Sequence, residues 1–255
     1  MKITLLPSAL GEDVDCSLQY LTSFLIDDAL AIDAGSLGFF RTPREQARIK
    51  HVLLSHSHID HLASLPIFLD NAYNETSVVT VYCSEWVLNC LQRDLFNDRI
   101  WADFIRLSKE GESLLNTAVL TPLVPVQADG LTITPVPVDH LVPTLGFIVE
   151  DATAAVAVSS DTGPTEEIWR RANALANLKA VFLEVAFPNA MADLAAKAKH
   201  HTPQSFGKEM SKLRLPVPVF AYHIKARFRE QIVKELYELG LPNLMVAEAE
   251  KPYLF

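Results

Sequence analysis

The chain has 255 residues, of which 49% are apolar, enough to bury a sizeable core in one large domain or two small ones. This composition excludes a disordered or fibrous protein. The formal net charge of −9 argues against a surface for long nucleic acids, which bind through clustered Lys and Arg side chains, but it does not exclude small anions.

The first residues, MKITLLPSALGED, lack the pattern of a secretory signal, and no run approaches the roughly 18 apolar residues of a spanning helix. We therefore expect a cytoplasmic protein that binds neither membrane nor nucleic acid. Three cysteines, Cys16, Cys83 and Cys90, form no CxxC pair, which favours reduced, buried thiols over disulfides. The sequence leaves the oligomeric state open, and a homodimer is one state that it allows.

In chain order, apolar runs predict strands at residues 2–6, 23–26, 30–33, 52–55, 78–83, 131–138, 146–149, 154–159, 180–185 and 217–222. The second and third of these strands are separated by the tight turn 27–29 and form a predicted hairpin. Apolar residues at every third or fourth position predict helices at 62–71, 85–95, 165–177, 191–199, 203–213 and 229–239. Thr165, which follows Pro164, is the predicted start of the third helix.

No glycine- and serine-rich linker interrupts the sequence, so we expect a single domain over residues 1–255. Strands dominate the first half, and strands then alternate with helices. This order is typical of a layered α/β architecture with mixed sheets inside and helices outside.

Metal-ligating residue types are concentrated in the segment SHSHIDH, at His56, His58, Asp60 and His61. The segment lies between an apolar strand and an apolar helix, so its side chains can converge on one point. Desolvated imidazole and carboxylate groups need partners, and a divalent ion such as Zn, Mn or Fe supplies them. We interpret the segment as a metal-binding loop.

Three further residues of ligand type stand at the ends of predicted strands. They are His140, Asp161 and His223. Strands of one sheet end at a shared edge, so we expect these side chains to meet the first cluster. Seven ligands are enough for two metal ions.

The segment HSHIDH matches the signature H-x-H-x-D-H, and the chain resembles the metallo-β-lactamase superfamily. Several stretches are similar to the class II cyclic-nucleotide phosphodiesterases: HSHIDHLASLPIF, LFNDRIWADF, SDTGPTEEIW, LKAVFLEVAFPN, HHTP and HIK. The resemblance implies a metallo-β-lactamase-type αββα sandwich, in which helices flank two mixed β-sheets. Ser160 departs from the family pattern, because glycine is common at that position.

The resemblance also implies the role of each ligand. His56, His58 and His140 would hold one ion, Asp60, His61 and His223 the other, and Asp161 would bridge them. Two divalent ions carry four positive charges against three on Asp60, Asp161 and a shared hydroxide, so the site would attract a small anionic substrate.

The reaction that the resemblance implies is hydrolysis of the 3′ bond of a 3′,5′-cyclic nucleotide (cAMP or cGMP) by a hydroxide that bridges two metal ions, which we expect to be Zn, with Mn or Fe as alternatives. The resemblance also implies the candidate catalytic residues, which are Asp60, Glu184 and His200. His200 would protonate the leaving oxygen, and Glu184 would orient its imidazole. His201 competes with His200 for the role of acid.

The resemblance also implies candidate substrate-binding residues, which are Asn97, Trp101 and Thr202. An aromatic ring beside Asn97 could stack on a purine whose edge the amide binds, but core packing would produce the same residue pattern. Lys225 could offset phosphate charge, and a solvated lysine is the alternative.

Two other reactions suit the same residues. One is hydrolysis of a carbonyl substrate, such as a lactone, a thioester or a β-lactam. The other is tRNA 3′-processing, against which the acidic balance and the lack of a basic arm argue. A binding module without enzymatic activity is the remaining alternative, and seven ligand-type residues disfavour it.

Overall fold

The computed structural model describes residues 1–8, 15–73 and 77–255, and these fall into two units. Unit 1 comprises residues 1–8, 21–73, 77–121 and 249–254. Unit 2 comprises residues 15–20, 122–248 and 255. The predicted single domain over residues 1–255 stays a prediction.

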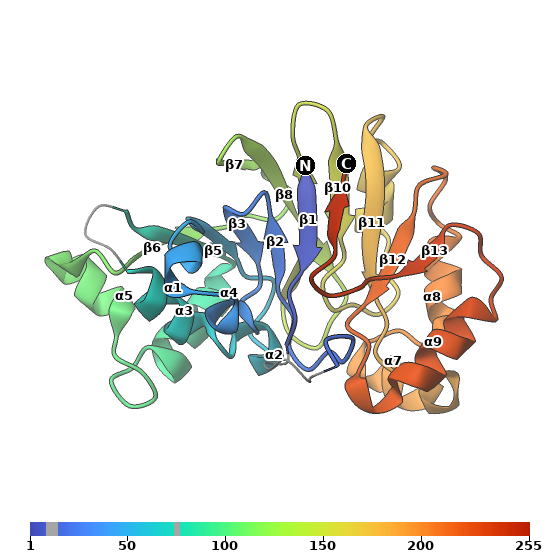
Figure 1. The fold of residues 1–255 in the computed structure, drawn as a ribbon, viewed down its shortest axis with the longest axis horizontal. Coiled ribbons are helices and arrows are strands. Elements are labelled where there is room, and N and C mark those ends of the chain that lie inside the picture. The colour runs from blue at the N-terminus through green and yellow to red at the C-terminus, as the bar shows by residue number, and fades with distance from the viewer. Residues whose placement is uncertain (9–14, 74–76) are drawn as a thin grey trace. The chain divides into compact units, whose positions relative to one another are not determined.

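Unit 1 contains a mixed, seven-stranded sheet in the order β14-β1-β2-β3-β4-β5-β6 (Figure 1). Its strands are β1 (Lys2–Leu5), β2 (Phe24–Ile26), β3 (Leu30–Ile32), β4 (His51–Leu53), β5 (Val79–Cys83), β6 (Leu115–Val119) and β14 (Pro252–Leu254). From β14 to β3 the neighbours are antiparallel, and from β3 to β6 they are parallel.

The predicted hairpin is confirmed, since β2 and β3 pair antiparallel across a tight turn. Asp27 and Asp28 both have positive φ, 48° and 60°, and the Ala29 amide donates to the Ile26 carbonyl at 3.1 Å. A two-residue turn with positive φ at both positions has a twist that matches the twist of the two paired strands. Aspartate adopts this left-handed backbone conformation more readily than most residues.

Unit 1 also contains several short helices. They are η1 (Leu37–Phe39), α1 (Pro43–Gln46), α2 (Ile59–Leu62), α3 (Leu65–Ala72), α4 (Glu85–Cys90), η2 (Leu91–Leu95), α5 (Phe104–Leu107) and η3 (Ser108–Glu112). Phe68 of α3 and Val81 of β5 belong to one buried apolar cluster, so α3 is held against this sheet by burial of its apolar face.

The single helix predicted at 62–71 is in fact two helices, α2 and α3. Ser64 separates them, because its amide and hydroxyl both donate to the Ala34 carbonyl, at 3.0 and 2.9 Å. Pro66 lacks an amide hydrogen and suits the first turn of the new helix.

Unit 2 contains a second mixed, seven-stranded sheet, in the order β13-β12-β11-β10-β9-β8-β7 (Figure 1). Its strands are β7 (Val126–Ala128), β8 (Leu131–Val138), β9 (Thr144–Glu150), β10 (Ala155–Val158), β11 (Leu178–Glu184), β12 (Val219–Tyr222) and β13 (Leu244–Val246). β10 to β13 are mutually parallel, and β9 is antiparallel to both β8 and β10. The carboxyl ends of β8, β10, β11 and β12 therefore lie at the same edge.

The helices of unit 2 are η4 (Asn189–Met191), η5 (Ala226–Phe228), α6 (Glu167–Ala172), α7 (Ala192–Ala198), α8 (Pro203–Met210) and α9 (Arg229–Tyr237). Trp169 of α6, Phe206 of α8 and Leu236 of α9 share one buried apolar cluster with the strands. In the described part of the chain, every helix is too short or too polar to span a membrane.

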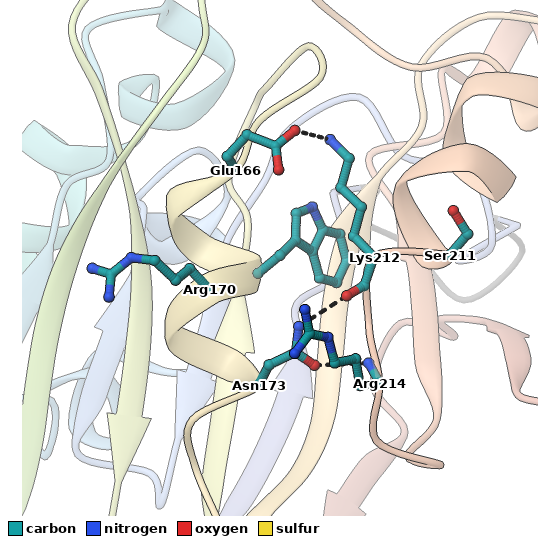
Figure 2. Close-up of a pocket in the computed structure, with 7 residues that line it drawn as sticks. Glu166, Arg170, Asn173, Ser211, Lys212 and Arg214 are labelled. Atoms are coloured by element: carbon teal, nitrogen blue, oxygen red, sulfur yellow. Dashed lines mark hydrogen bonds and ion pairs between the residues drawn. The ribbon is translucent and has the colours of Figure 1, made fainter.

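The predicted helix 165–177 is wrong at both ends, because α6 covers only Glu167–Ala172. Thr165 is held by tertiary contacts instead: its amide donates to Glu209 Oε2 at 3.3 Å and its carbonyl accepts from Lys212 Nζ at 2.9 Å. Beyond α6, Asn173 binds the Lys212 carbonyl at 2.8 Å and the Arg214 amide at 2.7 Å (Figure 2).

These contacts surround a surface hollow of about 510 Å³ lined by Glu166, Trp169, Arg170, Asn173, Ser211, Lys212 and Arg214 (Figure 2). Lys212 Nζ is neutralised there by Glu166 and by the buried Glu209, each at 2.7 Å. None of the residues that line the hollow belongs to the predicted site.

The sequence missed β6, β7, β13 and β14, which are the four edge strands of the two sheets. An edge strand has one pairing partner and often one exposed face, so its apolar pattern is weak. In β6, for example, only Leu115 is fully buried. Its pairing with β5, rather than its own side chains, defines the strand.

Candidate metal centre

The loop between β4 and α2 carries the first group of predicted ligands. The chain leaves β4 in extended conformation, and α2 begins after His58, so Asp60 and His61 lie in its first turn. The His56 ring centroid lies 4.7 Å from that of His58 and 4.2 Å from that of His61. His61 Nε2 is 3.9 Å from Asp60 Oδ2. Within unit 1 the structure therefore places these four side chains close together, and their role as metal ligands stays a prediction.

The tautomers of two of these histidines follow from their hydrogen bonds. A carboxylate only accepts, so His61 Nδ1 donates to Asp33 Oδ2 at 2.7 Å. The Ser55 hydroxyl donates to Asp33 Oδ2 at 2.8 Å, so it accepts from His56 Nδ1 at 2.9 Å. In both imidazoles Nε2 is therefore unprotonated and can bind a metal through its lone pair. A hydrogen bond from Nδ1 to a neighbouring acceptor is the usual arrangement around a metal-binding histidine.

Asp33 contacts a candidate ligand, His61, and the sequence reasoning missed it. It lies at the end of β3, is buried, and also accepts from the Ser55 amide at 2.8 Å. The available signal was an acidic residue closing an otherwise apolar strand, because a buried carboxylate needs partners to remain charged.

The second group of predicted ligands lies in unit 2, at the shared strand edge. His140 follows β8, Asp161 follows β10, and His223 follows β12. Asp161 Oδ2 lies 3.9 Å from His140 Nε2 and 3.5 Å from His223 Nε2. His140 Nδ1 donates to the Lys199 carbonyl at 3.1 Å, which again directs Nε2 into the cluster. The structure thus brings these three residues together.

His200 and Glu184 lie beside Asp161. His200 Nδ1 donates to Glu184 Oε1 at 3.0 Å, and His200 Nε2 is 4.0 Å from Asp161 Oδ2. Burial acts to lower the pKa of His200, but the charge and hydrogen bond of Glu184, with Asp161, outweigh it and raise that pKa overall. Glu184 Oε1 is itself fixed by the amides of Thr162 and His201, at 3.2 and 3.3 Å.

His201, the competing acid, has a different environment. Its Nδ1 is hydrogen-bonded to Ser205 Oγ at 3.1 Å, and its side chain is fully buried. Burial lowers its pKa. Thr202 caps α8 by accepting from the Ser205 amide at 3.4 Å. These contacts explain both residues as parts of the helix start, and the role of Thr202 in substrate binding stays a prediction.

Asn97 and Trp101, in unit 1, make local contacts. Asn97 Nδ2 donates to the Arg93 carbonyl at 2.9 Å, and its Oδ1 accepts from the amide of Ile100 at 2.9 Å. The Trp101 ring packs edge-on against Phe104, with centroids 6.5 Å apart. These contacts stabilise the loop, and base recognition by either residue stays a prediction.

Three site positions have left-handed backbone conformation. The φ angles are 61° at Asp33, 55° at Ser160 and 60° at His223. Such conformations are costly for residues other than glycine, and they persist where surrounding structure imposes them, often at functional sites. Each of these residues lies just after a strand, where the chain turns at the sheet edge that carries a ligand cluster.

The donor set of each unit fits a divalent metal. Two ligands at about 2.0–2.1 Å from one tetrahedral zinc lie about 3.4 Å apart. His223 Nε2 and Asp161 Oδ2 are 3.5 Å apart, and the ligand atoms of His56 and His58 lie within 4.8 Å of each other. Imidazole nitrogens and carboxylate oxygens together suit zinc, manganese or iron.

Comparison with known proteins identifies the family to which these candidate ligands belong. Residues 22–223 match the β-lactamase superfamily domain, a range that includes all seven predicted ligands. The chain belongs to the metallo-β-lactamase superfamily. The family match, together with two mixed sheets and their helices, confirms the predicted fold class.

Solved structures support this fold. Unliganded yeast PDE1 is 18% identical, with a TM-score of 0.79 over 100% of this chain and 99% of that one. The metallo-β-lactamase fold protein YhfI from Bacillus subtilis is 16% identical, with a TM-score of 0.71 over 99% and 98%. Human tRNase Z, short form, is 15% identical, with a TM-score of 0.70 over 100% and 99%. None of the curated protein sequences compared with the chain is significantly similar to it. The chain therefore has a metallo-hydrolase fold with candidate metal-binding residues.

Proposed function

We propose that this protein is a dinuclear metal-dependent phosphodiesterase that hydrolyses the 3′ bond of 3′,5′-cyclic nucleotides to give 5′-nucleotides. The observation that carries the proposal is the Glu184–His200 pair beside Asp161, with 3.0 Å between Oε1 and Nδ1. A substrate with a good leaving group is hydrolysed without a general acid. A ribose oxygen is a poor leaving group and has to be protonated as it departs.

The proposal includes a metal centre assembled from both ligand clusters. His56, His58 and His140 would hold one ion, Asp60, His61 and His223 the other, and Asp161 both. The buried imidazoles whose Nδ1 atoms are already hydrogen-bonded support this assignment. When bound, two divalent ions would activate a water molecule and act as Lewis acids toward the phosphoryl oxygens. Zinc suits the donors best, with manganese or iron as alternatives.

The chain's own residues would select and position the substrate. Asp60 and Asp161 carry only two negative charges against the four of two divalent ions, so the local potential would be positive despite the overall charge of −9. Burial acts to lower the pKa of His200, but Glu184 and Asp161 raise it overall, so the ring would be doubly protonated, with Nδ1–H donating to Glu184 and a second proton on Nε2. That proton would pass to the leaving 3′ oxygen.

The similarity to yeast PDE1, a cyclic nucleotide phosphodiesterase, supports the substrate class. The similarity to human tRNase Z supports tRNA 3′-processing as a second candidate. The net charge of −9 argues against the second, because tRNA binding relies on neutralising many phosphates.

A substrate panel tests the proposal. Metal-loaded protein is incubated with cyclic AMP, cyclic GMP, bis(p-nitrophenyl) phosphate, a lactone, a thioester and a 3′-extended tRNA precursor. We expect turnover of the cyclic nucleotides, with 5′-nucleotides as products and loss of activity after chelation. Turnover of only the carbonyl substrates, or of only the tRNA, would overturn the assignment.

A further inference from the structure

Lys225 is neither a candidate metal ligand nor the candidate acid, but it lies close to residues of both kinds. It lies two residues after His223, and its carbonyl accepts from the Phe228 amide at 2.9 Å, which fixes the backbone from which the side chain starts. Lys225 Nζ is 5.3 Å from the centroid of the Phe187 ring. This distance is that of a cation–π contact.

Phe187 connects this ammonium group to the candidate acid. The ring is 8% exposed and packs in a small apolar cluster with Ala186 and Ala195, so its position is well defined. Its other neighbour is His200, whose ring centroid lies 5.7 Å away in an edge-on arrangement. One aromatic ring therefore contacts both Lys225 and His200.

The charge of Lys225 is not cancelled by a carboxylate. Across the parts of the chain that the structure describes, no Asp or Glu oxygen forms an ion pair with its Nζ. Lys212 in the same unit is different, because Glu166 and Glu209 both pair with it. Lys225 is half-buried, its ammonium group lies over a ring, and it has no carboxylate partner in the described ranges, so its charge is available to an anionic ligand.

We propose that Lys225 binds a non-bridging phosphoryl oxygen of the substrate and thereby selects phosphate esters over uncharged carbonyl substrates. This inference rests on the proposed function. A phosphodiester has two non-bridging oxygens and one negative charge, and a lysine acts on them as a point charge. A lactone or a thioester offers no comparable anionic group.

The test measures phosphate binding as well as turnover. Titration calorimetry of metal-loaded protein with inorganic phosphate gives a dissociation constant that does not depend on catalysis. Lys225→Gln removes the charge and Lys225→Arg retains it. Lys251→Gln is the matched control, because Lys251 also lies over an aromatic ring, that of Tyr253, at 5.9 Å, and belongs to no candidate site.

We expect Lys225→Gln to weaken phosphate binding about tenfold or more, the typical worth of one charged hydrogen bond, and to raise KM for bis(p-nitrophenyl) phosphate more than it lowers kcat. Lys225→Arg should bind phosphate close to the wild-type level, and Lys251→Gln should be unchanged. If Lys225→Gln loses cooperative melting by circular dichroism, Lys225→Met replaces it.

Three results would overturn the inference: no phosphate binding by wild-type protein, unchanged binding in Lys225→Gln, or equal weakening in Lys225→Gln and Lys225→Arg. The last result would assign the effect to packing against Phe187. Normal phosphate binding by wild-type protein that turns over no phosphodiester would instead refute the proposed function and leave the anion site standing.

Discussion

His61 Nδ1 donates to Asp33 Oδ2 across 2.7 Å, and both side chains are buried. This contact fixes which nitrogen of His61 faces the ligand cluster. The relationship between the two residues makes Asp33 testable as an outer partner of the candidate metal centre.

Asp33→Asn should reduce metal affinity about 10- to 100-fold, because an amide is a weaker acceptor for the imidazole and can present its own donor instead. Metal content after dialysis against a weak chelator, measured by elemental analysis, checks this. Asp28→Asn in the β2–β3 turn is the control, since asparagine also tolerates that residue's φ of 60°. Equal metal retention in the two variants would remove Asp33 from this role.

Gly35→Ala should be strongly destabilising. An added Cβ would lie 2.0 Å from the Asp60 carbonyl oxygen and 2.7 Å from the Thr22 amide nitrogen, so the ligand loop would have to move. We expect a loss of about 2 kcal/mol or more in the free energy of unfolding, together with lower metal content. Gly163→Ala is the control, because its Cβ would meet no atom closer than 3.5 Å. Urea unfolding of both variants decides the point.

Ser160→Gly should raise the thermal midpoint of the metal-free protein. The φ of 55° at Ser160 costs a side chain about 1 kcal/mol that glycine avoids, and the buried hydroxyl has no hydrogen-bond partner among the residues that the structure describes. Ser160→Ala separates the two causes, since it removes the hydroxyl but keeps the Cβ. A midpoint for the glycine variant no higher than that of the alanine variant would mean that the backbone is not strained here.

Cys83 should resist alkylation in the folded protein. Burial raises its pKa from the ordinary 9.0 to about 12, so the reactive thiolate is scarce at neutral pH and also inaccessible. Peptide mapping after iodoacetamide treatment should find Cys83 modified only when urea is present. Between pH 9 and 12 the unfolded chain releases this proton and the folded chain keeps it, so stability should fall as pH rises.

His200→Ala should lower turnover of cyclic nucleotides by about 10²–10⁴-fold and spare bis(p-nitrophenyl) phosphate, because a nitrophenolate leaves without a proton. His51→Ala is the control, since His51 contacts Tyr82 through a 3.3 Å hydrogen bond and lies outside the ligand clusters. Steady-state kinetics on both substrates check the prediction. Equal losses on the two substrates would exclude His200 as the acid.

Much of the fold could be predicted because central strands carry a strong apolar signal. β8 was predicted with its observed bounds, since it runs through the sheet with neighbours on both sides. Helix boundaries were less accurate where a distant residue competes for the backbone, as Glu209 and Lys212 do for Thr165. No local pattern contains that information.

Some residues of the candidate site could likewise be predicted from the sequence, and others could not. His56, His58, Asp60 and His61 were predictable because a dense cluster of ligand-type residues has few structural explanations. Asp33 was not, because its role exists only through contacts with Ser55 and His61, more than 20 residues away in the sequence.

The pairing of β14 with β1 has a consequence for synthesis on the ribosome. Residues 252–254 complete a sheet whose other strands all precede residue 120. All strands of the second sheet are synthesised before β14, so until then β1 has no pairing partner on that side. Docking of β14 against β1 closes a very long loop, and the entropy lost in closing it makes this pairing a slow step of folding.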